Sequence, residues 1–339
     1  MDLEKKFKLI KRNTEEIISE EELRNLLTKK NKPVVYLGTA ITGRPHVGYF
    51  VWVLKLSDFL KAGFKVKILL ADLHGALDNT PWPVLEQRYK YYLKTIPLMF
   101  EALGINPKDL EFIKGSEFQL KPEYMYDLLQ LATFNSINDT RKAASEVVKF
   151  GDNPKLSGLI YPIMQALDEV YLNADVQYGG IDQRKILMFA RENLPKLGYD
   201  PRVEVMTPLI PGLVGKKMSA SDNKSKIDLL DSEEEVFRKV KNAECIEGNP
   251  DNGIMAFLKY VIMPLKSDNN KKFIVKRDKK FGGNLSYESY FEIEKDFISK
   301  KLHPLDLKNT VATEINFMLN VFRKNKKVLE SLSKEAYQN

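Results

Sequence analysis

The residues best suited to phosphate chemistry lie in Gly43-Arg44-Pro45-His46-Val47-Gly48-Tyr49, between an apolar run and a helical pattern. Pro45 is expected in the first turn of that helix, where proline is favoured. Free N–H groups at a helix N-terminus attract phosphate, and glycines such as Gly48 let it approach the backbone. His46 could donate a hydrogen bond to a phosphate oxygen as charge develops there. Taken alone, a segment this short is more often a capped, solvent-facing histidine.

A second candidate for phosphate chemistry is Lys217-Met218-Ser219-Ala220-Ser221. It follows a basic, glycine-containing stretch typical of loops that cover phosphates. A lysine on such a loop can swing onto the transferred phosphates and neutralise charge in the transition state. By itself the segment fits a solvated surface loop better.

A third group of polar residues has helical spacing. Tyr161, Gln165 and Asp168 recur at i, i+4 and i+7, so they form one narrow stripe of a predicted helix. An apolar stripe runs beside it and would anchor the helix in the core; its members are Leu159, Ile160, Met164 and Leu167. Such a polar stripe faces either a pocket or water, and the spacing does not choose between them.

The elements that would position these residues alternate between strands and helices. A short apolar run, 34–37, ends at Gly38 and predicts a buried parallel strand; a helix from Pro45 and a strand over 66–71 complete a βαβ unit. The alternation continues to residue 200 and predicts a doubly wound α/β domain. The further segments are a helix over 14–28 with Ser19 in a capping box, a strand over 110–114, helices from 122, over 136–149 and over 159–172, a strand over 176–178 and a helix after Gly180. Residues 117–157 are expected to form a helical insertion.

The character of the chain changes after Ser221. Ser232 and Glu235 have the spacing of a capping box, and helical patterns continue to the end, interrupted by a lysine-rich stretch over 266–280. The sequence therefore predicts two domains, 1–225 and 226–339, of which the second is mainly α-helical.

The composition excludes several classes of protein. The 339 residues carry 53 basic and 46 acidic side chains, a net charge of +7, which agrees with a polyanionic partner but is common among other proteins too. One cysteine, Cys245, allows neither an intrachain disulfide nor a cysteine zinc site. The N-terminus has no apolar core of a secretory signal, and no apolar run approaches the ~20 residues that span a bilayer. We therefore expect a cytoplasmic protein without a membrane segment.

The two phosphate-chemistry segments, in this order and on opposite sides of an α/β pattern, resemble the paired signatures of class I aminoacyl-tRNA synthetases. Tyr161-Pro162-Ile163-Met164-Gln165-Ala166-Leu167-Asp168 and Gly179-Gly180-Ile181-Asp182-Gln183-Arg184-Lys185 resemble the tyrosyl-tRNA synthetases of the archaeal and eukaryotic branch. The likeness covers about residues 8–325. It implies a Rossmann-like catalytic domain, a C-terminal anticodon-binding domain, and ligation of L-tyrosine to tRNA(Tyr) through a tyrosyl-adenylate.

The resemblance also implies a tyrosine pocket. Tyr161, Gln165 and Gln183 would bind the amino-acid end of tyrosine, and Tyr36 and Asp168 would face its hydroxyl group. A buried carboxylate left unpaired by phenylalanine discriminates strongly, on the order of 10⁵-fold, a magnitude that comes from a tyrosyl enzyme rather than from this chain.

For ATP, the resemblance implies catalytic roles for His46 and Lys217. The implied ATP-binding residues are Gly38, His46, Gly48, Gly180, Asp182, Lys217 and Met218. Asp182 suits the ribose hydroxyls. His74 could equally line the pocket or belong to the core. The three histidines are too far apart to suggest a metal site, so Mg²⁺ is expected to arrive with ATP. The second signature ends Ser219-Ala220-Ser221 where many synthetases have a second lysine, and Lys216 could substitute for that lysine in part.

For tRNA, the resemblance implies that Arg184 and Lys185 approach the acceptor stem. Phe281, His303 and Asp306 match anticodon-reading positions, where an aromatic ring and a carboxylate can bind a splayed-out base. Arg141 and Lys142 of the insertion either contact tRNA or form a solvated face. A homodimer joined through the insertion is expected, although Leu128, Leu131 and Phe134 could also be core residues.

Three other functions remain open on the sequence. A tryptophanyl enzyme would share the fold but would gain nothing from Tyr36 and Asp168 around a hydroxyl group. A small-substrate nucleotidyltransferase would need the first signature only. A non-catalytic tRNA-binding protein would not need His46 and Lys217.

Overall fold

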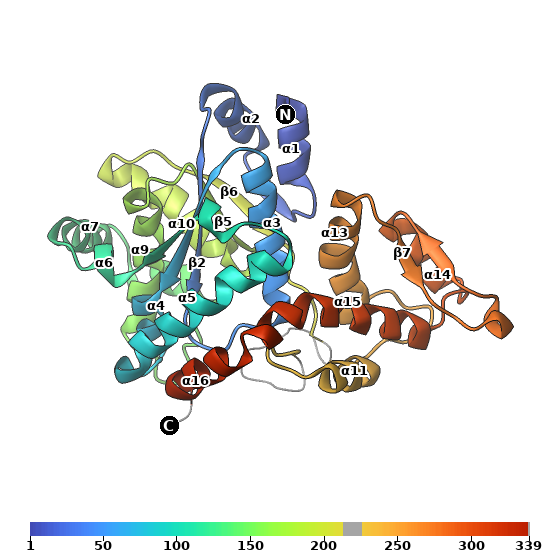
Figure 1. The fold of residues 1–339 in the computed structure, drawn as a ribbon. Helices are drawn as coiled ribbons and strands as arrows, with labels where there is room; N and C mark the ends of the chain where they lie inside the picture. Colours follow the sequence, from blue (N-terminus) through green and yellow to red (C-terminus); the bar gives the residue numbers. More distant parts are fainter. Residues whose placement is uncertain (213–225, 338–339) are drawn as a thin grey trace.

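A six-stranded sheet with the order β1-β6-β5-β2-β3-β4 forms the centre of the molecule (Figure 1). The computed structural model describes residues 1–212 and 226–337. All neighbouring strands run parallel except β1, which is antiparallel to β6. The strands are β1 (Glu16–Ile18), β2 (Val34–Ala40), β3 (Lys65–Ala71), β4 (Leu110–Lys114), β5 (Val176–Gly180) and β6 (Val203–Thr207). The predicted doubly wound α/β fold is thereby confirmed.

Helices cover both faces of this sheet, which explains why its central strands are apolar runs rather than alternating patterns (Figure 1). Five of these helices precede the insertion in sequence and one follows it. They are α1 (Leu3–Lys11), α2 (Glu20–Lys29), α3 (Phe50–Lys61), α4 (Asp72–Leu77), α5 (Leu85–Ala102) and, after the insertion, α10 (Arg184–Asn193). Short 3₁₀ turns connect them: η1 (Val47–Tyr49), η2 (Trp82–Val84), η3 (Pro107–Asp109), η4 (Ile181–Gln183) and η5 (Leu194–Leu197).

The N-terminal prediction was partly wrong. Residues Glu16–Ile18 are strand β1 rather than part of a helix, and α2 begins only at Glu20. The N-cap was predicted correctly, because the Ser19 hydroxyl accepts the N–H of Glu22 at 3.1 Å. Strand β6 was missed altogether. Residues 16–18 form a strand because they pair with β6, nearly 190 residues away in sequence. This long-range contact outweighs the local helical pattern.

The insertion contains α6 (Ser116–Gln119), α7 (Pro122–Thr133) and α8 (Ile137–Ala144), and leads into α9 (Ser157–Tyr171). Ser136 and Asp139 form a capping box at the start of α8. Leu128 and Leu131 are buried and belong to the core, whereas Phe134 is exposed. An exposed apolar surface on this segment comprises Leu120, Met125, Tyr126, Leu129, Phe134 and Ile137.

The C-terminal part is mainly helical, as predicted, and Ser232 and Glu235 form the expected capping box. Its helices are α11 (Glu233–Asn242), α12 (Gly253–Phe257), the π-helix η6 (Leu258–Ile262), α13 (Met263–Asp268), the 3₁₀ turn η7 (Lys279–Phe281), α14 (Tyr290–Ile298), α15 (Pro304–Lys324) and α16 (Lys326–Tyr337). The lysine-rich stretch contributes a hairpin that was not predicted, β7 (Phe273–Val275) paired with β8 (Leu285–Tyr287). Alternate residues of β7, Phe273 and Val275, are buried.

Helix α16 returns to the N-terminal part of the chain and lies beside α5 (Figure 1). Arg12 forms ion pairs with both Asp58 and Asp268, and so joins the N-terminal segment to α13. One hydrophobic cluster includes buried residues from both sides of residue 225. The predicted boundary falls between the described ranges, and the division into two domains stays a prediction.

Candidate active site

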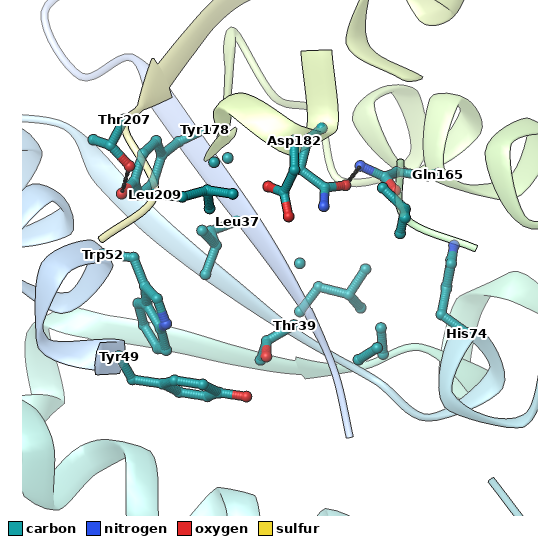
Figure 2. Close-up of a pocket in the computed structure, with 18 of the residues that line it drawn as sticks. Leu37, Thr39, Tyr49, Trp52, His74, Gln165, Tyr178, Asp182, Thr207 and Leu209 are labelled. Atoms are coloured by element: carbon teal, nitrogen blue, oxygen red, sulfur yellow. Dashed lines mark hydrogen bonds between the residues drawn. The ribbon is translucent and has the colours of Figure 1, made fainter. Parts of the chain in front are cut away.

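A cavity of about 680 Å³ lies at the carboxyl ends of β2 and β5, where ligands bind in open parallel sheets. Every described residue that was predicted for the tyrosine or ATP site lines it, namely Tyr36, Gly38, His46, Gly48, Tyr161, Gln165, Asp168, Gly180, Asp182 and Gln183. In the close-up, His74 and Gln165 lie on one side, Tyr49 and Trp52 on the other, and Asp182 faces the space between them (Figure 2). The predictions for Lys217 and Met218 lie outside the described residues.

His46 is buried at the wall of this cavity and acts as the N-cap of η1. Its Nδ1 accepts the N–H of Gly48 at 3.2 Å, which leaves the ring proton on Nε2. Burial lowers the pKa of His46 to about 4, and Lys226 adds to the effect. The imidazole is therefore neutral at physiological pH and offers one N–H donor.

The surroundings of His46 differ from the prediction. Pro45 precedes η1 and does not occupy a first helical turn, and α3 begins only at Phe50. The N–H of Val47 donates to the carbonyl of Ile227 at 3.1 Å, and that of Gly48 is used by His46. The idea of free N–H groups at this helix start was therefore wrong, because the protein already uses them. The donor that this segment can still offer to the cavity is the His46 side chain.

The chain returns to this segment at Lys226–Asp228. His46 and Asp228 form an antiparallel β-bridge, and Arg44 pairs with the Asp228 carboxylate at 2.7 Å. Lys226 is also a neighbour of His46, because its charge contributes to the lowered histidine pKa. The first signature thus lies directly beside the residues that follow the second signature in sequence.

Asp168 lies at the inner end of the cavity and is almost completely buried, with 1% of its surface exposed. Its Oδ1 accepts two hydrogen bonds, from Gln119 Nε2 at 2.8 Å and from the Tyr124 hydroxyl at 2.9 Å. Its Oδ2 has no hydrogen-bond partner within residues 1–212 and 226–337. Burial raises the pKa of Asp168 to about 8, against the lowering effect of the two donors. The site therefore presents a costly, unsatisfied acceptor to whatever enters the cavity.

His74 lines the cavity next to Asp168, so it is a pocket residue as well as a buried one. Its Nε2 lies 3.7 Å from Asp168 Oδ2, and its ring stacks edge-on against Tyr161 with centroids 4.7 Å apart. Gln119 Nε2 approaches its Nδ1 at 3.4 Å. Burial lowers the pKa of His74 to about 4, so the ring is a neutral neighbour of the carboxylate rather than its counter-ion.

Tyr36 completes this end of the cavity and is 1% exposed. Burial, together with the Asp168 carboxylate, raises the pKa of Tyr36 well above its ordinary value, so its hydroxyl keeps its proton. A Cβ added at Gly38 would make only ordinary van der Waals contacts, with the Tyr36 side chain at 3.5 Å and with Leu69 at 3.7 Å. Packing does not require this glycine, which leaves the space above it open to a ligand.

A further part of the wall is built by the turn after β5. Gln165 Nε2 donates to Gln183 Oε1 at 3.2 Å, which joins α9 to η4 at the edge of the cavity (Figure 2). A Cβ at Gly180 would lie 2.6 Å from Asp182 Oδ1 and 3.2 Å from Leu209. Gly180 is therefore needed so that the Asp182 carboxylate can turn toward the cavity.

Several residues that build the site were not anticipated from the sequence, some behind the cavity wall and some lining it. Gln119 and Tyr124, which hold Asp168, come from the insertion, and no motif distinguishes them. The aromatic and apolar side includes Thr39, Tyr49, Trp52, Tyr178, Thr207 and Leu209. Position could have indicated both Thr39 and Tyr178, since Tyr178 ends one predicted strand and Thr39 directly follows Gly38, where another ends.

The predicted acceptor-stem residues lie outside the cavity and are partly exposed. Arg184 pairs with Glu16 through two hydrogen bonds, of 2.6 and 3.0 Å. Lys185 pairs with Glu146 of the insertion at 2.9 Å. Arg141 lies over the Phe150 ring, 5.8 Å from its centroid. All these pairs are accessible to solvent, so an incoming polyanion could exchange with their carboxylate partners.

The predicted anticodon residues lie on two segments of the C-terminal part that Arg277 joins. Phe281 is exposed at the end of η7, and His303 caps α15 by accepting the N–H of Leu305 at 3.2 Å. Asp306 lies in the first turn of the same helix. Arg277 connects the two segments, because it donates to the carbonyls of Gly283 at 3.0 Å and Lys301 at 3.1 Å.

Neither metal binding nor membrane insertion is suggested by the described residues. Within residues 1–212 and 226–337 no group of three or more histidine, cysteine, aspartate or glutamate side chains could hold a metal ion. In the same ranges, no helix is long and apolar enough to cross a bilayer.

A parallel sheet with a nucleotide-sized cavity at its carboxyl ends and a histidine signature at its first crossover defines a class I synthetase-like protein. The family model described as "tRNA synthetases class I (W and Y)" matches residues 28–320. The cytoplasmic tyrosine–tRNA ligase of Saccharomyces cerevisiae is 45% identical over 99% of this chain and 89% of its own length. The chain belongs to this family, in its tyrosyl-tRNA synthetase branch.

An animal relative and a solved archaeal structure support the same assignment to the tyrosyl-tRNA synthetase branch. The cytoplasmic tyrosine–tRNA ligase of Gallus gallus is 47% identical over 99% of this chain, which spans about 64% of the relative's length. The crystal structure of the Archaeoglobus fulgidus tyrosyl-tRNA synthetase with L-tyrosine has a TM-score of 0.89 at 42% identity, over 95% of this chain and 99% of that one. The resemblance to the archaeal and eukaryotic branch is confirmed.

Proposed function

We propose that this protein ligates L-tyrosine to the 3′ end of tRNA(Tyr) in two ATP-dependent steps. The observation that carries the proposal is the free acceptor at the inner end of the cavity, Asp168 Oδ2. Tyr124 and Gln119 fix the other oxygen of this carboxylate, so its orientation is set before a ligand arrives. A phenol hydroxyl is the donor that satisfies it, and phenylalanine offers none.

The remaining walls fit the other parts of the substrates. The amides of Gln165 and Gln183, with the Tyr161 hydroxyl, suit the ammonium and carboxylate groups of the amino acid. Asp182 suits the ribose hydroxyls of ATP, and the apolar side with Tyr49, Trp52 and Leu209 suits an adenine ring. ATP enters as its Mg²⁺ complex, which is a substrate here. The tyrosine-bound relative from Archaeoglobus fulgidus supports this assignment.

In the first step, a carboxylate oxygen of tyrosine attacks the α-phosphorus of ATP, a P–O bond forms, and pyrophosphate leaves. His46 contributes a neutral Nε2–H donor to the phosphate oxygens, where negative charge accumulates. Because this donor carries no net charge, it stabilises the transition state without holding the product tightly. Lys217 and Met218 stay predicted partners from the second signature.

In the second step, a hydroxyl of the terminal tRNA ribose attacks the carbonyl carbon of the adenylate, and AMP leaves. Arg184 and Lys185 would guide the acceptor stem, since both lie just beyond the cavity wall formed by η4. Phe281, His303 and Asp306 would read the anticodon, with the ring stacking on a base and the carboxylate accepting from its edge.

We further propose a homodimer joined through the insertion. The exposed apolar surface defined above on α7 and its flanks would be covered by a second copy. A cytoplasmic location fits the relatives, which are named as cytoplasmic enzymes. Light scattering at micromolar protein, compared with a Leu129→Glu variant, tests the dimer: a monomeric wild type would refute it.

Pyrophosphate exchange into ATP tests the activity. The wild type should exchange with tyrosine, and exchange with phenylalanine or tryptophan should be weaker by several orders of magnitude. Tryptophan-dependent exchange would instead indicate a tryptophanyl enzyme. Charging of tRNA(Tyr) transcripts, with a tRNA carrying an altered anticodon as the matched control, then tests the second step. Failure of tyrosine to support exchange would refute the proposal.

A further inference from the structure

Two glutamates behind the cavity have no place in the proposed chemistry. Glu169 follows Asp168 on α9, and Glu204 lies in the middle of β6; both are 0% exposed. None of their four carboxylate oxygens has a hydrogen-bond partner in the described ranges. Two fully buried acceptor groups without donors are too costly to persist as two bare carboxylates.

The sheet register ties these groups to the substrate cavity. Tyr36 of β2 lies opposite Gln177 of β5, and Gln177 lies opposite Glu204 of β6. Neighbouring residues in parallel strands point to the same face, so Tyr36, Gln177 and Glu204 form one row beneath α9. Gln177 lines the cavity, and its Oε1 also has no partner in the described ranges. Glu204 is thus one side chain away from the cavity wall.

Charge balance indicates how many protons the two carboxyl groups hold. The charged groups that act on them are Asp168 on α9, Arg191 on α10, Arg202 before β6 and Glu22 on α2. Arg191 is already paired with Glu22 at 2.8 Å. Arg202 remains, and its buried Nε has no hydrogen-bond partner in the described ranges. One guanidinium offsets one carboxylate, not two.

We propose that Glu169 and Glu204 together hold one proton at neutral pH and act as positioning residues for the phenol end of the tyrosine site. The retained proton limits the buried negative charge behind Tyr36 and Gln177. Without that further charge, the substrate hydroxyl can draw Asp168, whose pKa is raised by burial to about 8, into its ionised, accepting form. This inference rests on the proposed function, because it assigns the pair to that same site.

Electrostatics between the groups agrees with this assignment. Burial raises the pKa of both glutamates well above the usual range, and the Glu169 carboxylate adds to the rise for Glu204. Both carboxylates also act on Tyr36, whose pKa they help to raise. If the pair lost its proton, a second negative charge would be added behind Asp168, and the ionised form of that carboxylate would be disfavoured.

Glu204→Gln tests the proposal, because the amide permanently imitates a protonated carboxyl group of nearly the same shape. Glu192→Gln, on the exposed face of α10, is the matched control. KM for tyrosine and KM for ATP are measured by pyrophosphate exchange between pH 7 and 9.5 with the full chain. The wild type and the control should lose affinity for tyrosine at alkaline pH by up to about tenfold per pH unit relative to Glu204→Gln. The pH dependence of KM for ATP should be the same in all three proteins.

Thermal unfolding without substrate gives an independent readout. A pair that retains a proton in the folded state loses stability as pH rises above the unfolded glutamate pKa, whereas Glu204→Gln does not lose that contribution. The Tm of Glu204→Gln should therefore rise relative to the wild type as pH increases from 5 to 8. Should Glu204→Gln fail to fold, Glu169→Gln carries the same expectations.

Coinciding tyrosine KM profiles, or a Tm difference that does not change with pH, would overturn the proposal. A wild type without tyrosine-dependent exchange would instead refute the proposed function. The unfolding experiment would then still show whether the pair holds a proton.

Discussion

The substrate cavity and the surface predicted to bind tRNA differ in how far their functional side chains are exposed to solvent. In the cavity, Asp168, His46 and Tyr36 are each less than 10% exposed, and burial shifts the pKa of every one of them. On the outer surface, Arg184 and Phe281 are accessible to solvent, and Arg184 is neutralised by an exchangeable glutamate.

The difference separates two kinds of specificity. A buried acceptor without a partner imposes a large penalty on the wrong ligand, since nothing else can satisfy it. An exposed ring or guanidinium loses only the interaction itself when its partner is wrong, since water replaces it. Substitutions in the cavity should therefore alter the choice of amino acid, and substitutions on the surface should alter the choice and affinity of tRNA.

The largest effect is expected for Asp168→Asn. The amide keeps an acceptor for Gln119 and Tyr124 but presents its NH₂ group to the substrate hydroxyl. The ratio of kcat/KM for tyrosine over phenylalanine should fall by about 10²-fold or more in pyrophosphate exchange. Asp127→Asn is the control, because Asp127 also accepts from tyrosine hydroxyls, those of Tyr171 and Tyr199, but outside the cavity. Equal losses in both variants would contradict the assignment.

The same variant has a predicted pH signature. The folded pKa of Asp168, about 8, lies above its ordinary value of 3.8, so the protonated form stabilises the fold. That contribution is complete below the unfolded pKa and is lost as pH rises through 8. Asp168→Asn cannot lose it, so the variant should gain on the order of 1–3 kcal/mol relative to the wild type between pH 4 and 8. Urea unfolding at the two pH values measures this difference.

The next largest effect is expected for His46→Asn. Asparagine can still accept the Gly48 N–H as an N-cap but cannot supply the Nε2 donor. The kcat of exchange should fall by about 10²-fold, with little change in KM for tyrosine. The reduction should be constant between pH 6 and 9, since His46 is neutral throughout this range. His303→Asn, at a histidine with the same capping geometry on the exposed surface, should leave exchange unchanged.

A smaller and different effect is expected for Phe281→Ala. Exchange without tRNA should be unaffected, while kcat/KM for tRNA(Tyr) should fall by roughly 10-fold, as for the loss of one base-stacking contact. Phe291→Ala, at another exposed phenylalanine of the C-terminal part, is the matched control. If both variants charged tRNA normally, the predicted anticodon surface would be wrong.

The smallest effect is expected for Arg184→Ala. The exposed pair with Glu16 contributes at most about 1 kcal/mol to folding, so Tm should hardly change. KM for tRNA should rise a few-fold at low salt, and the difference from the wild type should shrink as salt increases. A change in KM for tyrosine would contradict the expectation that substitutions on the surface affect only tRNA binding.

The sequence by itself determined the α/β class, most element positions and the family, because each depends on local periodicity or on motifs within a few residues. The stripe of Tyr161, Gln165 and Asp168 was visible for the same reason, since helical spacing places these side chains together. The predicted helix caps at Ser19 and Ser232 likewise follow from neighbours three residues away.

Only the tertiary structure decided what those residues meet. Strand β1 forms because β6 lies beside it, and the hairpin of β7 and β8 forms within a lysine-rich stretch because alternate residues are buried. Gln119 and Tyr124 reach Asp168 from the insertion, more than 40 residues away. Desolvation lowers the pKa of His46 and raises the pKa values of Glu169 and Glu204. It arises from packing across the whole fold, so neither residue type nor spacing in the sequence reveals it.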